Sequence, residues 1–135
     1  MSSVVDSSAL FALLDPREEH HAWASLTFST LAGPWLTCEA VLTETFFQVH
    51  EPQARALSRM LRSGAVRVAF DLQQELTAVL DLRDKYANVP MSLADACLVR
   101  MSETLPEPVI VTTDSDFRIY RRHGRRAVPV LMPED

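Results

Sequence analysis

An α/β fold, with a parallel sheet covered by helices on both faces, is predicted for this chain of 135 residues. Short apolar runs of the length of buried strands alternate along the chain with longer segments of helical character. Gly, Pro, Asp or Ser marks most of the junctions between them. No internal repeat or linker divides the chain, so a single domain is expected over residues 1–135.

The first half of the chain predicts two short strands and three helices. Val4-Val5 is the first strand, and the two serines that follow Asp6 suit the start of a helix. Asp15-Pro16 stops that helix, and Gly33-Pro34 breaks the chain again. The predicted elements are a strand at 4–5, helices at 7–14 and 17–32, a strand at 35–37 and a helix at 38–50.

The second half continues the alternation. Glu51-Pro52 opens a helix that Gly64 ends, Asp71 suits the N-cap of the next helix, and Ser92 suits the N-cap of the one after. Helices are therefore expected at 51–63, from Asp71 to about 86, and from Ser92 to about 104, with strands at 65–70, 109–113 and 127–131 and a loose tail at 133–135.

Two acids stand where predicted strands end. Asp6 follows the first strand, and Asp114, in the segment TTDSDF, follows the fourth. Ligands of open parallel sheets bind beyond the carboxyl ends of the strands, where the strand order reverses. If the first and fourth strands are neighbours, Asp6 and Asp114 flank that crevice. Either acid alone is weak evidence, because Asp is common just after a strand or at the start of a helix, and capping is the better explanation of Asp6 taken by itself.

Two further acids lie within apolar helical segments. Glu44 stands in AVLTETFF and Asp95 in SLADACLV. Buried charge is rare unless it is paired or bound to metal. Asp95 also suits the first turn of a helix, and Glu44 also suits the polar edge of one. Glu39 competes with Glu44 for a functional role, because five residues turn a helix by roughly 140° and one face cannot present both.

Together these acids favour a site for a hard cation. Carboxylates that are close together repel one another, and a cation relieves that repulsion. Oxygen ligands select Mg²⁺ or Mn²⁺. The four histidines lack zinc spacing, and the two cysteines, Cys38 and Cys97, lie far apart in apolar surroundings, which favours buried free thiols. Only three glycines are present, so a glycine-rich phosphate loop is not expected.

The motifs Asp6-Ser7-Ser8, Glu44, SLADA around Asp95 and TTDSDF resemble those of the PIN domain family. In size and motif order the chain is similar to the VapC-type toxins of type II toxin–antitoxin pairs. The resemblance implies a three-layer α/β/α fold with a parallel five-stranded sheet of order 3-2-1-4-5. It implies a Mg²⁺- or Mn²⁺-dependent endoribonuclease that hydrolyses RNA phosphodiester bonds with metal-activated water.

The resemblance also assigns the site. Asp6, Glu44, Asp95 and Asp114 form the catalytic and metal-binding quartet, and Asp116 is a further metal ligand. Thr112 and Ser7 are supporting hydroxyls. Two alternatives stay open: a non-catalytic PIN-fold binding module, and an orphan PIN nuclease without an antitoxin. The implied partners are an RNA substrate, a cognate antitoxin protein and a second copy in a homodimer.

The charge distribution bears on nucleic-acid binding. The net charge of −5 counts against it, but five of the arginines stand between residues 118 and 126. Arg118, Arg121 and Arg122 are candidates to bind RNA phosphates or an acidic partner. Any one of them alone is better explained by a solvated surface, and it is their clustering that favours a binding role. No segment is apolar enough to span a membrane and the N-terminus does not resemble a signal peptide, so a cytoplasmic protein is expected.

Overall fold

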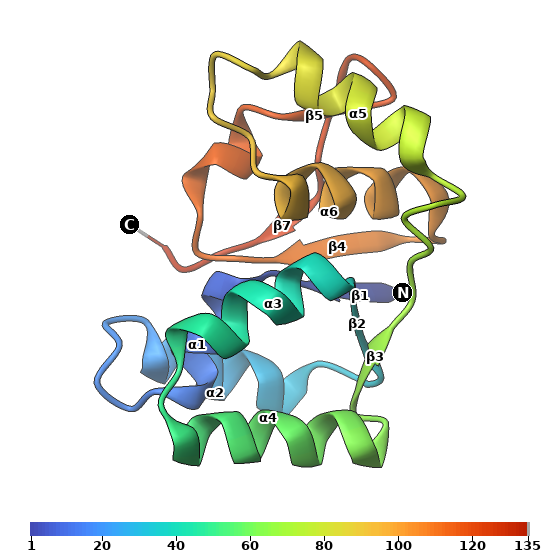
Figure 1. Cartoon of the computed structure of the whole chain (residues 1–135). Helices are drawn as coiled ribbons and strands as arrows, with labels where there is room; N and C mark the ends of the chain where they lie inside the picture. Colours follow the sequence, from blue (N-terminus) through green and yellow to red (C-terminus); the bar gives the residue numbers. More distant parts are fainter. Residues whose placement is uncertain (135) are drawn as a thin grey trace.

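The computed structural model of the chain describes residues 1–134; Asp135, the last residue of the expected tail, lies outside them. Helices and strands alternate as predicted (Figure 1). The helices are α1 (Ser7–Leu14), α2 (His21–Thr30), α3 (Glu39–Gln48), α4 (Glu51–Ser63), α5 (Leu76–Lys85) and α6 (Leu93–Thr104), with a 3₁₀ turn η1 (Ser115–Arg118). The strands are β1 (Ser2–Val5), β2 (Trp35–Thr37), β3 (Val66–Val68), β4 (Pro108–Val111), β5 (Arg121–Arg122), β6 (Arg126–Ala127) and β7 (Val130–Leu131).

Five of these strands form one parallel sheet of order β3-β2-β1-β4-β7. The last strand along the chain is the fifth in this sheet, so the order agrees with the expected 3-2-1-4-5. Helices α1 to α4 cover one face, and α5, α6 and the β5–β6 hairpin lie on the other (Figure 1). This arrangement is the predicted three-layer α/β/α fold.

The central strands are apolar because both of their faces are covered. Val4, Val5, Ile110 and Val111 are fully buried, and they form one core with residues from α1 and α6. Cys38 and Cys97 are buried and free, as expected. No helix among residues 1–134 is both long and apolar enough to cross a membrane.

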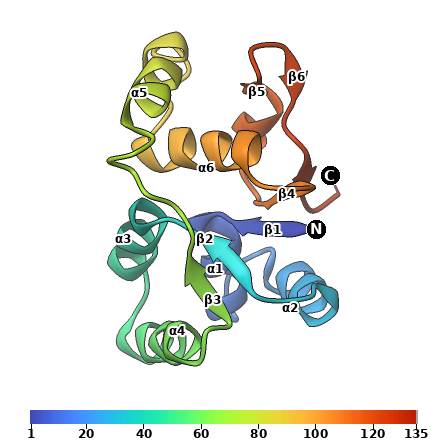
Figure 2. The same ribbon diagram turned by 90° about the vertical axis from the view of Figure 1, so that its right-hand side faces the viewer.

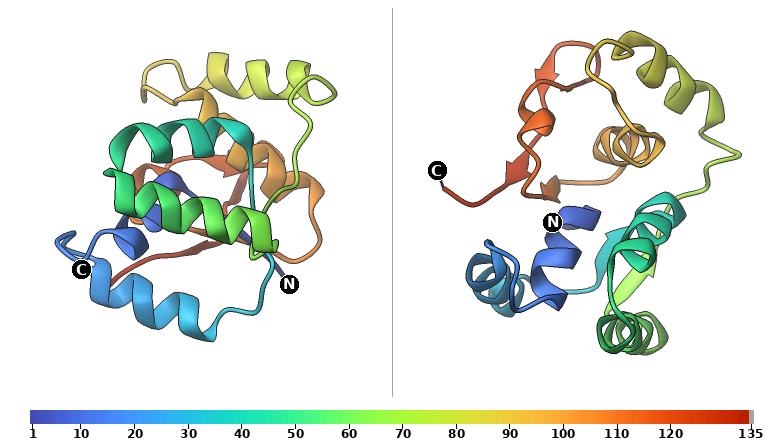
Figure 3. Two further views of the ribbon diagram at one scale, coloured as in Figure 1. Left: turned by 60° about the horizontal axis from the view of Figure 1, so that its bottom comes forward. Right: turned by 60° about the vertical axis from the view of Figure 1, so that its left-hand side comes forward.

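Strand β1 is the point where the strand order reverses. It pairs with β2 on one side and with β4 on the other, and Val5 lies opposite Val111. The residues that follow these two strands therefore emerge side by side at the same edge of the sheet. The right-hand view of Figure 3 shows α1, α3 and α6 arranged around that edge.

Several predicted boundaries are wrong where side chains divert the backbone. The helix predicted over 17–32 begins only at His21, because the carboxylates of Asp15 and Glu18 accept the N–H groups of Arg17 and His20 and hold the chain in turns. The helix predicted from Asp71 begins at Leu76, with Glu75 as its N-cap. Asp71 instead accepts the N–H of Gln74 in a separate turn.

The strand predictions were too long at three places. The strand predicted over 65–70 covers only Val66–Val68. The fourth strand ends at Val111 rather than residue 113, because the Thr112 hydroxyl accepts the Asp114 N–H and curves the chain. The segment 127–131 splits: β6 pairs with β5 in a hairpin that was not predicted, and only Val130–Leu131 joins the sheet.

Candidate active site

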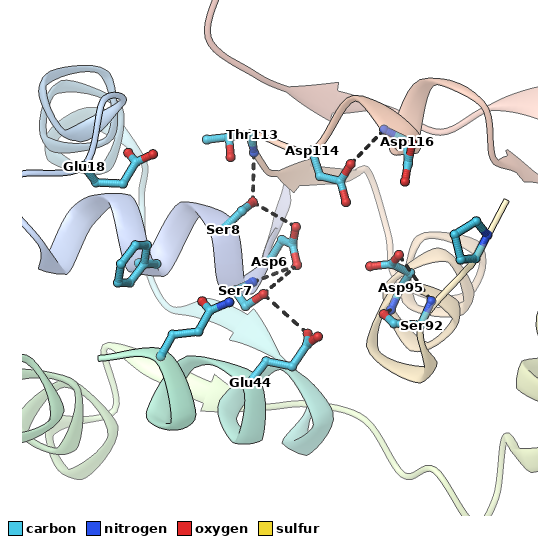
Figure 4. A pocket seen from close by; sticks show the side chains of 13 residues that line it. Asp6, Ser7, Ser8, Glu18, Glu44, Ser92, Asp95, Thr113, Asp114 and Asp116 are labelled. Atoms are coloured by element: carbon cyan, nitrogen blue, oxygen red, sulfur yellow. Dashed lines mark hydrogen bonds between the residues drawn. The ribbon is translucent and has the colours of Figure 1, made fainter. Parts of the chain in front are cut away.

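A pocket of about 380 Å³ opens where β1 and β4 end (Figure 4). Five separate segments of the chain contribute to it: the start of α1, the turn before α2, helix α3, helix α6, and the turn after β4. No Lys, Arg or His is among its lining residues within the described chain. Six residues with carboxylate side chains line it: Asp6, Glu18, Glu44, Asp95, Asp114 and Asp116.

Asp6 is the most deeply placed of these acids. It is the N-cap of α1, and its Oδ1 accepts the Ser7 N–H at 2.7 Å. Its side chain is nevertheless only 3% exposed, and no cation of the described chain pairs with it. Burial raises the pKa of the Asp6 carboxyl, with a smaller contribution from the charge of Asp114, against the lowering effect of its hydrogen bonds. Asp6 is therefore both a helix cap and a buried, uncompensated acid.

Two hydroxyls fix the orientation of Asp6. Thr112 Oγ1 donates to Asp6 Oδ2 at 2.7 Å, and Ser8 Oγ donates to the same oxygen at 2.9 Å. The pairing of β1 with β4 brings Thr112 beside Asp6. Thr112 Oγ1 also accepts the Asp114 N–H at 3.0 Å, so one hydroxyl joins the two acids that follow the strands.

Asp95 occupies the first turn of α6. Its N–H donates to Ser92 Oγ at 3.0 Å, and its own Oδ2 accepts the Ser92 N–H at 3.4 Å, which makes a capping box. The same Oδ2 accepts the hydroxyl of the fully buried Tyr120 at 3.0 Å. Burial, and then the charge of Asp6, raise the pKa of Asp95 to about 6 despite these bonds.

Glu44 reaches the pocket from α3. Its Oε1 accepts Ser7 Oγ at 3.4 Å, and Ser7 Oγ lies equally far from Asp6 Oδ1, so the serine stands between the two acids. Burial and the charge of Asp95 raise the pKa of Glu44. Glu39 lines a different, smaller cavity beside Cys38 and Cys97. Of the two glutamates, Glu44 is therefore the one that lines the acidic pocket.

Asp114 and Asp116 belong to the turn after β4. Asp114 is the N-cap of η1, and its Oδ1 accepts the Asp116 N–H at 2.9 Å. Both side chains are half-buried and line the pocket on the side away from Glu44 (Figure 4). The spacing of two residues in TTDSDF therefore serves the turn and places both carboxylates at the pocket.

The donor set suits a hard divalent cation, because it consists of carboxylate and hydroxyl oxygens around a buried negative charge. Burial raises the pKa values of Asp6, Glu44 and Asp95, and the charges of neighbouring pocket acids raise them further. No Lys, Arg or His lines the described pocket to compensate these charges. The carboxylates are arranged around the pocket and do not converge on one point. Among residues 1–134, no three His, Cys, Asp or Glu side chains form a ready-made metal-binding cluster.

All the acids and hydroxyls expected at the site are brought together, and four more residues join them. Glu18 lines the pocket, Ser8 and Tyr120 hold acids by hydrogen bonds, and Ser92 caps the helix of Asp95. Ser92 was expected only as a cap. The turn before α2 that brings Glu18 back to the sheet edge, and the course of the chain that places Tyr120 under α6, have no local signal in the sequence.

The arginines expected at an RNA or partner surface lie outside the pocket. Arg118 is exposed at the end of η1. The Arg121 guanidinium folds back onto its own chain, where Nη1 donates to the carbonyls of Arg118 and Tyr120 at 2.8 and 3.0 Å. Arg122 is half-buried, and its Nη2 lies 3.2 Å from the ring of His123.

Comparison with known proteins agrees with the geometry. A search of curated proteins found no match. The family comparison matches a PIN domain over residues 3–122, which spans all the pocket acids and both central strands. Since this match covers most of the 135 residues, the chain belongs to the PIN domain family.

Proposed function

We propose that this PIN domain is an endoribonuclease that depends on Mg²⁺ or Mn²⁺ and acts as a VapC-type toxin. PIN domains are in general metal-dependent nucleases. The observation that carries the proposal is that six carboxylate residues from distant parts of the chain line one pocket, which no basic residue of the described chain lines. Structural acids would be spread over the surface or paired with Lys or Arg.

The quartet Asp6, Glu44, Asp95 and Asp114 would hold the cation, with Asp116 beside it. A divalent cation bound there supplies positive charge next to the scissile phosphate and lowers the pKa of a water molecule toward neutrality. The protein's own contribution is orientation. Thr112 and Ser8 fix the rotamer of Asp6, and the hydroxyl of Tyr120 fixes Asp95.

No side chain of the pocket suits nucleophilic catalysis. The Ser8 hydroxyl donates a hydrogen bond to Asp6 and accepts one from the Thr113 N–H, so it is fully engaged. Within residues 1–134, no histidine lines the pocket, so no imidazole base is at hand to activate Ser7 or Ser92. Attack by water is therefore the route that the pocket favours.

RNA as substrate, an antitoxin as partner and a homodimer as the assembly belong to the same proposal and are supported by the VapC-like motif order. An antitoxin would restrain the nuclease by covering the acidic pocket. A non-catalytic binding module is the competing outcome, and the experiment below separates the two.

The test is cleavage of end-labelled total RNA by purified protein in Mg²⁺, in Mn²⁺ and in EDTA. Asp95→Asn protein is compared with Asp81→Asn, which makes the same change at an exposed acid of α5 that does not line the pocket. We expect cuts that need metal, vanish in Asp95→Asn and persist in Asp81→Asn. RNA that stays intact under all conditions, together with no metal binding by calorimetry, would refute the nuclease.

A further inference from the structure

The β5–β6 hairpin is the feature of the fold that the acidic pocket does not explain. It stands on the same face of the sheet as α5 and α6 (Figure 2), and hydrogen bonds from Lys85 and to Tyr86 join it to the C-terminal end of α5. Residues 123–125 connect its two strands, and His123 and Gly124 both have positive φ values, 51° and 81°. Four of the chain's arginines lie within residues 121–126.

Two of these arginines are engaged within the protein. Arg121 donates to the carbonyls of its own turn and so stabilises the exit from η1. Arg122 is half-buried, with its Nε shielded from solvent and Nη2 against His123. Their charges are therefore poorly placed to meet a ligand in solvent.

The other two arginines face solvent. Arg125 and Arg126 are exposed, and no hydrogen bond or ion pair joins their guanidinium groups to another residue of the described chain. Together with His123 they line a depression of about 540 Å³. Lys85, the only lysine of the chain, adds a third charge there, because its Nζ donates to the Gly124 carbonyl at 3.1 Å. We name Lys85, Arg125 and Arg126 the hairpin tip.

The hairpin tip is held in a fixed position on the protein. The His123 N–H donates to Glu103 Oε2 at 2.7 Å, the Arg121 N–H donates to Tyr86 Oη at 2.9 Å, and Lys85 bonds to the turn. A surface that is already ordered loses less conformational entropy when it binds. In a protein with a net charge of −5, this is an organised concentration of positive charge.

Helix α6 relates the hairpin tip to the acidic pocket. At the N-terminal end of α6, Asp95 bonds to Tyr120, just before the hairpin; toward the other end, Glu103 bonds to His123 in the hairpin turn. Asp95 and Glu103 are eight residues apart, which is about 12 Å along a helix axis. The chain from Tyr120 to the hairpin turn therefore runs along α6, and the hairpin tip lies beside the end of α6 that is farther from the pocket.

We infer that the hairpin tip binds backbone phosphates of an RNA strand on one side of the cleavage site. This inference rests on the proposed function. An RNA strand in the pocket would place its scissile phosphate among carboxylates, and every carboxylate that a cation does not neutralise repels it. Binding of such a strand therefore needs positive charge that contacts the phosphates on either side of the scissile one. The hairpin tip supplies it, with guanidinium groups that match phosphate geometry.

The test measures binding of a fluorescein-labelled oligouridylate by anisotropy over a series of KCl concentrations. All proteins carry Asp95→Asn so that the RNA stays intact. R125Q/R126Q is compared with R59Q/R62Q, which removes two exposed arginines from α4 and has the same net charge. Each lost phosphate contact makes the negative slope of log Kobs against log[KCl] shallower by about 0.7 for a single strand. The slope should therefore become shallower by about 1.4 in R125Q/R126Q and stay almost unchanged in the control.

Three results would overturn the inference. The first is a decrease in the salt slope of R59Q/R62Q that equals the decrease in R125Q/R126Q. The second is no binding of the oligouridylate by the parent even at low salt. The third is binding of poly-L-glutamate that is as tight as binding of the oligouridylate and is weakened as much by R125Q/R126Q. The last result would identify a site for an acidic protein. Cleavage by the otherwise unmodified protein is measured separately, so a nuclease without phosphate contacts at the hairpin tip is distinguished from an RNA-binding protein that does not cut.

Discussion

Hydroxyl groups, more than the acids themselves, account for the geometry of the pocket. Thr112, Ser8 and Tyr120 each donate to a buried carboxylate oxygen, and Ser7 lies between Asp6 and Glu44. A neutral donor orients a carboxylate and leaves its negative charge in place, whereas Lys or Arg would neutralise it. Hydroxyl donors therefore suit a pocket that attracts a cation, and hydroxyls orient Asp6 and Asp95 in this pocket.

Tyr120→Phe tests this support at one atom. The ring is fully buried against Tyr86 and Phe117, so the substitution keeps the packing and removes only the donor to Asp95. Because that bond lowers the pKa of Asp95, its loss should raise the pKa above the present value of about 6. The acidic limb of the pH–rate profile should move to higher pH, and urea unfolding at neutral pH should show a loss of about 1 to 3 kcal/mol.

Tyr86→Phe is the matched control for this prediction. It removes a hydroxyl from the neighbouring ring, but that hydroxyl accepts the Arg121 N–H and does not touch Asp95. Its pH–rate profile should therefore stay in place. An acidic limb that does not move in Tyr120→Phe would show that Tyr120 is only a packing residue.

At the scale of elements, local signals explain what the sequence predicted well. Helix α4 has the predicted bounds, because Pro52 suits its first turn and Gly64 adopts a φ of 82° at its end. Helix α6 begins after Ser92, as the capping pattern indicates. Both signals lie within four residues of the boundary that they fix, and neither depends on a distant contact.

The mistaken elements have two causes: a local turn that competes with a helix cap, and contacts between residues that are distant in sequence. The turn at residues 72–75 precedes α5 because Asp71 bonds locally instead of capping the helix. The β5–β6 hairpin is anchored through Glu103 and Lys85, which are distant in sequence. The same reason explains the site: the acids that end strands or interrupt apolar helices were predicted, and Glu18, which lies in an irregular turn, was not.

The capping box of α6 gives a prediction at this scale. Ser92→Ala removes the acceptor of the Asp95 N–H and should lower the free energy of unfolding by about 1 kcal/mol. It should also weaken metal binding, because the first turn that carries Asp95 is less fixed. Urea unfolding and calorimetry measure the two effects. Ser92→Thr, which keeps the cap hydroxyl, should restore both, and Ser63→Ala at the exposed end of α4 should change neither.

For the whole molecule, strand order is what creates the site. The chain moves outward from β1 through β2 to β3, crosses back over the other face, and then adds β4 and β7 on the opposite side of β1. The connections after β1 and β4 therefore diverge, and their separation leaves the crevice in which Asp6 and Asp114 stand. Residues from 6 to 116 reach one pocket, so the stability of the entire domain is linked to the charge of that pocket.

This linkage predicts how the stability of the metal-free domain depends on pH. The pKa of Asp95 rises from 3.8 to about 6 on folding, and those of Asp6 and Glu44 rise as well. Between the two pKa values the folded state binds protons that the unfolded state releases. The resulting stabilisation of the folded state is complete below the pKa of the unfolded state, and it is lost as the pH rises through the pKa of the folded state. In EDTA, the thermal midpoint should fall between about pH 4 and about pH 7.

Divalent cation should reverse that fall, because it binds the ionised carboxylates of the folded state. At a concentration of about 100 times its Kd, Mg²⁺ or Mn²⁺ should add about 2.7 kcal/mol at neutral pH and far less near pH 5, where protons compete for the same oxygens. Thermal unfolding with and without metal at both pH values measures the difference. Asp95→Asn should flatten the EDTA curve and reduce the metal effect, while Asp81→Asn should behave as the parent. A midpoint in EDTA that rises toward neutral pH would mean that the pocket acids are compensated by the protein itself and that no cation is needed to stabilise them.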